Sequence, residues 1–266
     1  MDEHEISPEH PRATSLKIRS KLVQGFLKGI TSTFGLFAHG RGEAFDYLIG
    51  EVTTTNAQNA IRVAAASFLL SRHPVISVNG NVAALVPHDL VRLAEVTGAK
   101  LEVNLYHRSK ERETAIAQVL RDAGASEIYG LDSKFHRTIP EIHSDRRIVD
   151  QRGLFTADLA FVPLEDGDRT EGLVKQGKKV ITIDLNPLSR TAQMATISII
   201  DNIVRALPLL VLTLDQLQSK THTELEQIQN EFDNHHNLSE AIRIINERLN
   251  MLAATQGLSN EGGTDR

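Results

Sequence analysis

The chain has 266 residues and a formal net charge of −5 at pH 7; 41% of its residues are hydrophobic and 24% are charged. This length suits one large α/β domain with a helical appendage, or two modest domains. The lack of cysteine excludes disulfides, cysteine nucleophiles and thiolate metal sites, and the acidic balance argues against general nucleic-acid binding.

Nothing in the sequence predicts a membrane or secreted protein. No apolar run approaches the roughly 18 to 20 residues that a bilayer span needs. Residues 1–12 are polar and acidic and lack the apolar core of a secretory signal. We therefore expect a cytoplasmic protein without membrane partners.

The chain is expected to begin with an arm and a helix. Residues 1–14 show no periodicity and are expected to be a flexible arm. From Ser15 to Ile30, apolar residues recur at helical spacing. Arg19 lies off this apolar stripe, and its position alone indicates a solvated charge.

A glycine-rich segment follows over residues 35–51. Gly40 and Gly42 flank Arg41, which predicts a loop that brings its backbone and one guanidinium close to phosphate oxygens. His39 adds a titratable ring next to them. The segment does not match the Rossmann fingerprint, because Phe45 occupies the position of the third glycine. An exposed arginine in an ordinary loop is the alternative.

Short runs rich in β-branched and apolar residues predict buried strands further along the chain. They alternate with helical segments, which is typical of a doubly wound parallel sheet with helices on both faces. The expected strands are 74–78, 101–106, 127–129, 158–163, 180–185 and 196–200.

Polar residues follow three of these strands, at the sheet edge where parallel α/β sheets bind ligands. Asn79 to Asn81 predict a loop for a phosphate or carboxylate, with a plain strand-to-helix turn as the alternative. Asp184 and Asn202 end two later strands and flank residues 189–191. This pattern indicates a nucleotide site, although residues of this kind also cap turns and helices.

An acidic turn follows the strand expected at 158–163. Glu165, Asp166 and Asp168 surround Gly167, an arrangement that suits Mg²⁺ or a cationic substrate. The alternative is a charged turn in which Asp168 caps the helix that Arg169 opens.

The remaining segments are a long polar stretch and two helices. Residues 131–155 are interpreted as a partly mobile lid, and their His and Arg spacing fits no common zinc pattern. Helices are expected over 213–232 and 238–252, the second with an apolar seam for the same chain or a dimer partner. The expected divisions are a core over 15–212, C-terminal helices over 213–254 and a disordered tail over 255–266.

Six stretches together resemble the archaeal 4-phosphopantoate–β-alanine ligase family, also called phosphopantothenate synthetase. They are HPR at 10–12, AHGRGEAFDYLIGE at 38–51, SVNGNVAALVP at 77–87, VPLEDGDRTE at 162–171, ITIDLNPLSR at 181–190 and DNIVRA at 201–206. The likeness runs in order from about His10 to Leu252. It departs at Ala13 and Thr14, where the family has an aromatic residue, in 131–155 and in the tail.

The resemblance implies a Rossmann-like homodimer of coenzyme A biosynthesis. Its activity would join 4-phosphopantoate to β-alanine and convert ATP, with Mg²⁺, to AMP and pyrophosphate. The family's ATP contacts fall on Arg19, Arg41, Asp184, Leu185, Asn186, Arg190, Thr191, Asn202 and Ile203.

On this basis we predict catalytic roles for three residues and substrate contacts for six others. Arg41 and Arg190 would stabilise charge on phosphate oxygens, and His39 would accept the ammonium proton of β-alanine. Substrate contacts are expected from Asn79, Gly80, Asn81, Asp166, Asp168 and Arg169. The ligands of Mg²⁺ are not assigned.

Three alternatives remain open at this point. A non-catalytic ATP-binding regulatory module on the same fold would bind ATP and release no AMP, since a fold does not fix function. An NAD(P)-dependent oxidoreductase is less consistent with the sequence, because the glycine-rich signature is missing. Pantoate without its phosphate is a possible acceptor, although a basic pocket around Arg169 favours the phosphorylated compound.

Overall fold

The structure is a computed structural model and describes residues 6–261 of the chain. Residues 1–5 of the expected arm and 262–266 of the expected tail lie outside this range. Helix α1 (Ala13–Leu27) begins two residues earlier than expected. The last helix, α11 (Asn234–Glu261), continues past the expected boundary at residue 254.

A five-stranded parallel sheet forms the centre of the molecule, with the strand order β2-β1-β5-β6-β7. Its strands are β1 (Pro74–Val78), β2 (Lys100–Val103), β5 (Leu159–Phe161), β6 (Lys179–Ile183) and β7 (Ile197–Ile199). β1 pairs with both β2 and β5, so the winding direction of the chain reverses between β1 and β5. The strand expected at 127–129 is a single bridge between Tyr129 and Glu102. The predicted doubly wound, Rossmann-like α/β fold is confirmed.

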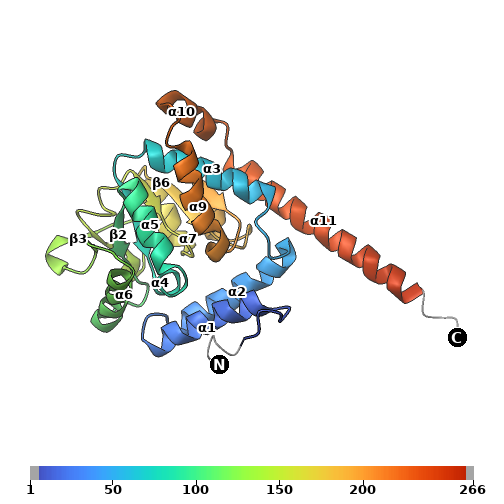
Figure 1. Ribbon diagram of the computed structural model, residues 1–266. Helices are drawn as coiled ribbons and strands as arrows, with labels where there is room; N and C mark the ends of the chain where they lie inside the picture. The colour runs from blue at the N-terminus through green and yellow to red at the C-terminus, as the bar shows by residue number, and fades with distance from the viewer. Residues whose placement is uncertain (1–5, 262–266) are drawn as a thin grey trace.

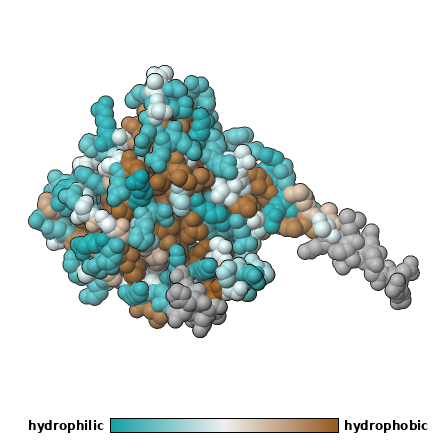
Figure 2. Space-filling view, in the orientation of Figure 1, coloured by the Kyte–Doolittle hydropathy of each residue, from teal (hydrophilic) through white to brown (hydrophobic). Residues whose placement is uncertain are grey.

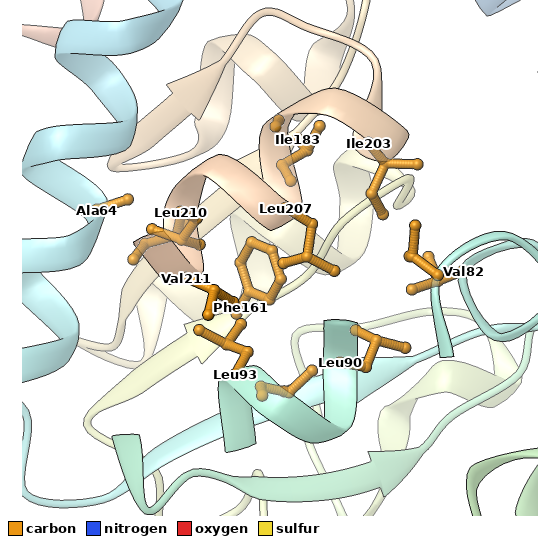
Figure 3. Close-up of a cluster of buried hydrophobic side chains, with 14 of the residues drawn as sticks. Ala64, Val82, Leu90, Leu93, Phe161, Ile183, Ile203, Leu207, Leu210 and Val211 are labelled. Carbon is orange, nitrogen blue, oxygen red and sulfur yellow. The ribbon is translucent and has the colours of Figure 1, made fainter. Parts of the chain in front are cut away.

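The larger core lies between one face of the sheet and helices α3 (Thr55–Leu70), α5 (Pro87–Thr97) and α9 (Ile203–Leu217). In Figure 3, Phe161 of β5 lies between Leu93 of α5 and Leu207 of α9. Each of these side chains is almost fully buried, and burying one contributes roughly 1.5–3 kcal/mol. Helices α4 (Gly80–Leu85), α6 (Lys110–Asp122) and α10 (His222–Asn230) complete this side.

The second face of the sheet is covered by α7 (Gly167–Lys175), α8 (Arg190–Met194) and residues 131–157. Within this last segment, β3 (His136–Thr138) and β4 (Ile148–Asp150) pair antiparallel. Its apolar residues pack into the smaller core; they are Ile139, Ile142, Val149, Leu154 and Ala157. The structure thus corrects the interpretation of residues 131–155 as a lid, because the segment is part of the sheet's cover.

Glu102 anchors this cover to β2. Its carboxylate accepts the N–H groups of Asp150 (3.1 Å) and Leu154 (2.6 Å). The side chain is fully buried, and burial raises the pKa of Glu102 from its ordinary value of 4.5 to about 7. The folded state therefore binds the Glu102 proton more tightly than the unfolded state does.

This pKa shift predicts a pH-dependent contribution to stability. The contribution is complete below pH 4.5 and is lost as the pH rises to about 7, a change of about 3 kcal/mol. We expect the difference in unfolding free energy between wild type and Glu102→Gln to fall by about this amount between pH 4.5 and 8. Urea unfolding of both proteins measures it, and a pH-independent difference would show that Glu102 has an ordinary pKa.

Helices α1 and α2 (Thr33–Ile49) lie together at one side of the body (Figure 1). Two glycines permit their close approach to α4. A Cβ on Gly80 would lie 2.2 Å from the carbonyl oxygen of Ile30, and a Cβ on Gly35 would lie 2.3 Å from Oδ1 of Asn81.

A substitution at one of these glycines is expected to separate the helix pair from α4. Gly80→Ala should lower the unfolding free energy by about 1–3 kcal/mol, because Ile30 opposes it with rigid backbone. Gly40→Ala is the matched control: no atom lies within 4 Å of its added Cβ, and alanine in a helix interior stabilises by up to about 1 kcal/mol. Equal effects of the two substitutions in thermal unfolding would contradict this packing.

The C-terminal part differs from the single helix expected at 213–232. A capping box at Thr221 and Glu224 starts the separate helix α10, and the boundary expected at residue 212 falls within α9. Helix α11 projects from the body (Figure 1). Among the helices described within residues 6–261, none has the length and hydropathy of a membrane span.

Candidate functional site

The glycine-rich segment is helical, which corrects its interpretation as a loop. Ser32 caps α2 because its hydroxyl accepts the backbone N–H of Gly35 (3.3 Å), and Gly50 ends the helix with φ 89°. Glycine in a helix interior costs about 1 kcal/mol, so the local sequence favours a loop. Tertiary contacts of the buried Glu43, Asp46 and Ile49 stabilise the helix instead.

Helix α2 contacts the residues that follow three strands at the carboxyl edge of the sheet. Asn81 Nδ2 donates to the carbonyl of Gly35 (2.8 Å), and Asn202 Nδ2 donates to Asp46 Oδ2 (2.7 Å). Between these two bonds Gly42 faces Leu185, whose Cδ1 would lie 3.7 Å from a Cβ added to the glycine. Asn81, Leu185 and Asn202 follow β1, β6 and β7. The 11-residue step from Gly35 to Asp46 spans about 16 Å along the helix axis, so α2 links both halves of this edge.

A cleft of about 720 Å³ lies between α2 and the ends of β1, β2 and β5. We call it the α2 cleft. It is lined by Ser32, Phe34, Gly35, Phe37, Ala38, Arg41, Asn79, Gly80, Asn81, Leu105, Tyr106, His107, Arg112, Arg146, Leu164 and Asp166. It lies beside the reversal in winding between β1 and β5, where doubly wound sheets bind ligands. Five predicted site residues line it: Arg41, Asn79, Gly80, Asn81 and Asp166.

Asn79 shapes the floor of the α2 cleft. Its Oδ1 accepts the N–H of Val82 (3.1 Å), and its Nδ2 donates to the carbonyls of Pro163 (3.0 Å) and Leu164 (3.1 Å). These bonds join the ends of β1 and β5. Leu164 has φ 51°, a conformation that costs a non-glycine residue roughly 1–2 kcal/mol.

Asp184 organises the loop after β6, beside the α2 cleft. Its carboxylate accepts the N–H of Asn186 (2.9 Å) and the hydroxyl of Ser189 (2.5 Å). Burial raises the pKa of Asp184, against the lowering effect of these bonds and of Arg41. The loop therefore holds residues 184–186 in one conformation at the sheet edge.

Asn202 follows β7, the strand next to β6, and caps α9. The carboxylate of Asp46, its hydrogen-bond partner, also forms an ion pair with Arg205 (2.6 Å). Arg205 pairs in turn with the buried Asp201 (2.6 Å), whose other oxygen accepts the hydroxyl of Thr53 (2.6 Å). This network fixes Asn202 and Ile203 against α2.

Helix α8 places Arg190 and Thr191 beside the acidic turn. Thr191 donates its hydroxyl to the carbonyl of Glu165 (2.7 Å), and the exposed Arg190 pairs with Glu171. A Cβ on Gly167 would lie 2.5 Å from Cβ of Arg190. Glycine at 167 therefore permits α8 to approach the turn.

His39 and Arg19 lie outside the α2 cleft. Residues two apart on a helix point about 200° apart, so His39 faces away from Arg41. It lies near Glu43 of α2, which binds Arg19 (2.8 Å). Burial lowers the pKa of His39, which favours the neutral imidazole at pH 7. The structure does not bring His39 to the position expected of a base beside Arg41.

Arg169 is fully buried beneath the α2 cleft and does not line it. Its Nη1 donates to the hydroxyl of Ser77 (2.9 Å) and to the carboxylate of Glu165. Glu165 also binds Arg146 (2.8 Å), and Arg146 binds Asp166 (3.1 Å). Arg169 is therefore connected to the α2 cleft only through Glu165 and Arg146, and the direct substrate contact predicted for it does not fit this position.

The sequence comparisons identify the family of the chain. The family model described as phosphopantothenate/pantothenate synthetase matches residues 56–248. The chain belongs to this family. A 4-phosphopantoate–β-alanine ligase of Thermococcus kodakarensis is 51% identical over 249 residues, covering 93% of this chain and 95% of the relative. One of Methanosarcina mazei is 50% identical over 253 residues, covering 95% and 99%. The resemblance inferred from the six stretches is confirmed.

Two cations that line the α2 cleft were missed by the sequence reasoning. Arg146 lies in the segment interpreted as a lid and was assigned no role in the site. It is only 6% exposed and lines the α2 cleft. Arg112 of α6 lines the same cleft. Neither belongs to the stretches that carry the family resemblance, so no local signal marked them.

Within residues 6–261, no group of three or more His, Asp or Glu side chains is arranged to hold a metal. Asp166 lines the α2 cleft, whereas Asp168 lies in the first turn of α7 outside the lining. Glu165 is neutralised by Arg146 and Arg169. Mg²⁺ commonly binds one or two carboxylates together with substrate phosphates, which this acidic turn permits.

Proposed function

We propose that the chain is an ATP-dependent ligase that condenses 4-phosphopantoate with β-alanine. The products are 4′-phosphopantothenate, AMP and pyrophosphate, in coenzyme A biosynthesis. Relatives named 4-phosphopantoate–β-alanine ligase, which are about half identical over nearly their whole length, support this reaction. In the structure, the position of Arg41 on α2 gives this reaction its main support. Arg41 lines the α2 cleft, and its charge also acts on Asp184 in the loop after β6.

The reaction requires two steps, because a carboxylate is a poor acceptor for an amine. A carboxylate oxygen of 4-phosphopantoate attacks the α-phosphorus of ATP, and pyrophosphate leaves with the electron pair of the broken P–O bond. The neutral amine of β-alanine then attacks the acyl carbon. AMP leaves with the former carboxylate oxygen, and the amine loses its proton to a base.

The two halves of the sheet's carboxyl edge bind different substrates in this proposal. ATP binds along 184–186, Arg190, Thr191 and 202–203, with Arg19 at the outer side of α2. The acceptor binds in the α2 cleft. Arg41 reaches both and stabilises the negative charge that builds on the α-phosphate, as an oxyanion-hole donor does. Mg²⁺ would reach the acidic turn with the nucleotide and neutralise phosphate charge.

β-Alanine requires an anion for its ammonium group and a base for its proton. Asp166 is the carboxylate that lines the α2 cleft. We assign the ammonium contact to Asp166. The proton transfer predicted for His39 remains a prediction, and it would require β-alanine to approach from the Glu43 side of α2.

The role of His39 can be tested by substitution. His39→Ala should lower kcat by about 100-fold at saturating β-alanine if the imidazole accepts the proton. Unchanged turnover would remove that role and leave Asp166 or water as the base. His88→Ala is the control variant and should keep wild-type turnover, because His88 is exposed on another helix, α5.

We also propose that the chain acts as a cytoplasmic homodimer. The expected seam of α11 consists of Leu238, Ile242, Ile245, Leu249 and Leu252. Leu238 is buried and packs with Ala241, whereas Ile242, Leu249 and Leu252 are exposed. Figure 2 shows brown side chains among polar ones where this helix leaves the body. A single-chain mass in solution at micromolar concentration would contradict the dimer.

AMP release tests the proposed reaction. Purified protein is given ATP and Mg²⁺, with and without 4-phosphopantoate and β-alanine, and with Mg²⁺ removed by EDTA. We expect AMP and pyrophosphate only when both partners and the metal are present. ATP binding without AMP release under any condition would favour a regulatory module.

A further inference from the structure

A second cavity lies between α1, the turn that follows it and the helices α4, α5 and α6. Its volume is about 560 Å³, and small-molecule sites typically measure about 300–1,000 Å³. We call it the α1 pocket. None of the described residues that line it also lines the α2 cleft. The α1 pocket is therefore separate from the site assigned to the acceptor.

Much of the α1 pocket is lined by apolar side chains. They are Ile30, Ala83, Ala84, Leu85, Pro87 and Val119. Helix α1 packs beside α4 at this point (Figure 1), and a Cβ on Gly25 would lie 2.9 Å from Cβ of Ala84. This lining can take apolar surface of a ligand out of water, which favours binding.

Two lysines line the α1 pocket from the side of α1. Lys21 lies within this helix, and Lys28 is its C-terminal cap. Residues seven apart lie on the same side of a helix, about 10 Å apart along its axis. Both lysines are exposed, and neither ammonium group has a hydrogen-bond or ion-pair partner within residues 6–261.

Asp89 is the only carboxylate among the described lining residues. It is half-buried, and burial raises its pKa against the lowering effect of His88 and Lys21. Lys21 thus lies close enough to compensate Asp89, whereas Lys28 has no counter-ion. Two lysines and one aspartate give the lining a net charge of +1, on a chain whose net charge is −5.

We propose that the α1 pocket is an effector site for an aliphatic monocarboxylate that also carries a hydroxyl or amide donor. The carboxylate of the ligand meets Lys28, its aliphatic body covers the apolar lining, and its donor binds Asp89 at the Lys21 end. The roughly 10 Å between the two lysines sets the length of the ligand. The single excess positive charge fits a monocarboxylate better than a phosphate dianion.

Ile30 connects the α1 pocket to the α2 cleft. It lines the α1 pocket, and its carbonyl accepts Nη2 of Arg112 (3.1 Å), which lines the α2 cleft. The same carbonyl would lie 2.2 Å from a Cβ on Gly80, another residue of the α2 cleft. A ligand that moves Ile30 therefore changes the wall of the α2 cleft, which couples the two sites.

Pantothenate and panthenol are a matched pair of probes for this site. Pantothenate carries one carboxylate, an amide and two hydroxyls on an aliphatic body, and panthenol has an alcohol in place of the carboxylate. We expect calorimetry to show that wild type binds panthenol about 10- to 100-fold more weakly than pantothenate, because the charge-assisted bond to Lys28 is lost. Equal affinities would overturn the proposal.

Substitution of Lys28 should have the same effect as removal of the carboxylate. Lys28→Gln should bind pantothenate as weakly as wild type binds panthenol. The control is Lys17→Gln, because Lys17 is exposed on α1 and lies outside the pocket lining. It should keep wild-type affinity, and a loss shared by both variants would contradict a specific contact with Lys28.

Methyl NMR of wild type locates the bound pantothenate without any variant. The methyl signals of Ile30, Leu85 and Val119 should shift with the calorimetric affinity. Shifts confined to Leu105 and Leu164 would place pantothenate in the α2 cleft instead and overturn the proposal. These binding measurements use no other substrate, so they do not depend on the proposed reaction.

The effector role is tested on AMP release. Pantothenate should inhibit wild type without competing with 4-phosphopantoate, because its occupancy moves Ile30 away from Arg112. Lys28→Gln should keep the basal rate and lose this inhibition. Competitive inhibition of equal strength in both proteins would show that pantothenate acts in the α2 cleft and would remove the effector site.

Discussion

Replacement of Arg41 by alanine is expected to lower kcat for AMP release by about 100- to 1,000-fold. Arg41 lines the α2 cleft and its charge acts on Asp184, so it lies between the two halves of the site. Loss of one fixed donor to a developing oxyanion costs about 3–4 kcal/mol in comparable sites. Steady-state kinetics with all three substrates at saturation measure the effect.

Stability should not change in this variant, because the Arg41 side chain is exposed. Arg62→Ala serves as the control, since Arg62 is an exposed residue of α3 outside the α2 cleft. It should retain wild-type kcat and wild-type thermal unfolding. Near-normal turnover in Arg41→Ala would mean that charge on the α-phosphate is stabilised elsewhere.

Replacement of Glu165 by alanine is expected to have the largest effect on stability. Glu165 is almost fully buried between Arg146 and Arg169, which are themselves buried. Its removal leaves two buried guanidiniums short of an anion, and breaking such a pair costs about 3–5 kcal/mol. Urea unfolding measures this loss, and AMP release should fall because Arg146 is no longer held in the cleft wall.

Glu171→Ala is the matched control for this substitution. Glu171 pairs with Lys175 and Arg190 at the surface of α7 and α8, where ion pairs contribute little to stability. We expect no measurable change in its urea midpoint. Equal midpoints for Glu165→Ala and wild type would contradict the buried ion-pair network.

Local sequence patterns were sufficient to predict the sheet and its ligand-binding edge. β1, β5, β6 and β7 are short β-branched or apolar runs, and each is followed by polar or turn-forming residues. Such runs have few alternatives to a buried parallel strand. The positions of Asn79, Asp184 and Asn202 followed directly from these strand ends.

Features that depend on tertiary contacts could not be predicted in this way. Gly40 and Gly42 favour a loop by propensity, yet the segment is a helix, which the bond between Asp46 and Asn202 ties to the sheet edge. That helix turned His39 away from Arg41, although the two are close in sequence. Adjacency along the chain therefore gave a wrong expectation of adjacency in the site.

The cations of the α2 cleft were hidden for a related reason. Residues 131–155 have no periodicity, so the burial of Arg146 depends on Glu165 and Asp166, which are distant in sequence. Arg112 lies in an ordinary amphipathic helix, and only the contact with Ile30 places it in the cleft. Charge pairing across such distances leaves no local pattern.

The most direct test of the proposed reaction follows the oxygen atoms of the acceptor. 4-Phosphopantoate labelled with ¹⁸O in its carboxylate is incubated with ATP, Mg²⁺, β-alanine and the purified protein. Attack of the carboxylate on the α-phosphorus predicts one ¹⁸O atom in each AMP and none in pyrophosphate, by mass spectrometry. AMP without the label, or label in an inorganic phosphate product, would contradict activation of the acceptor at this site.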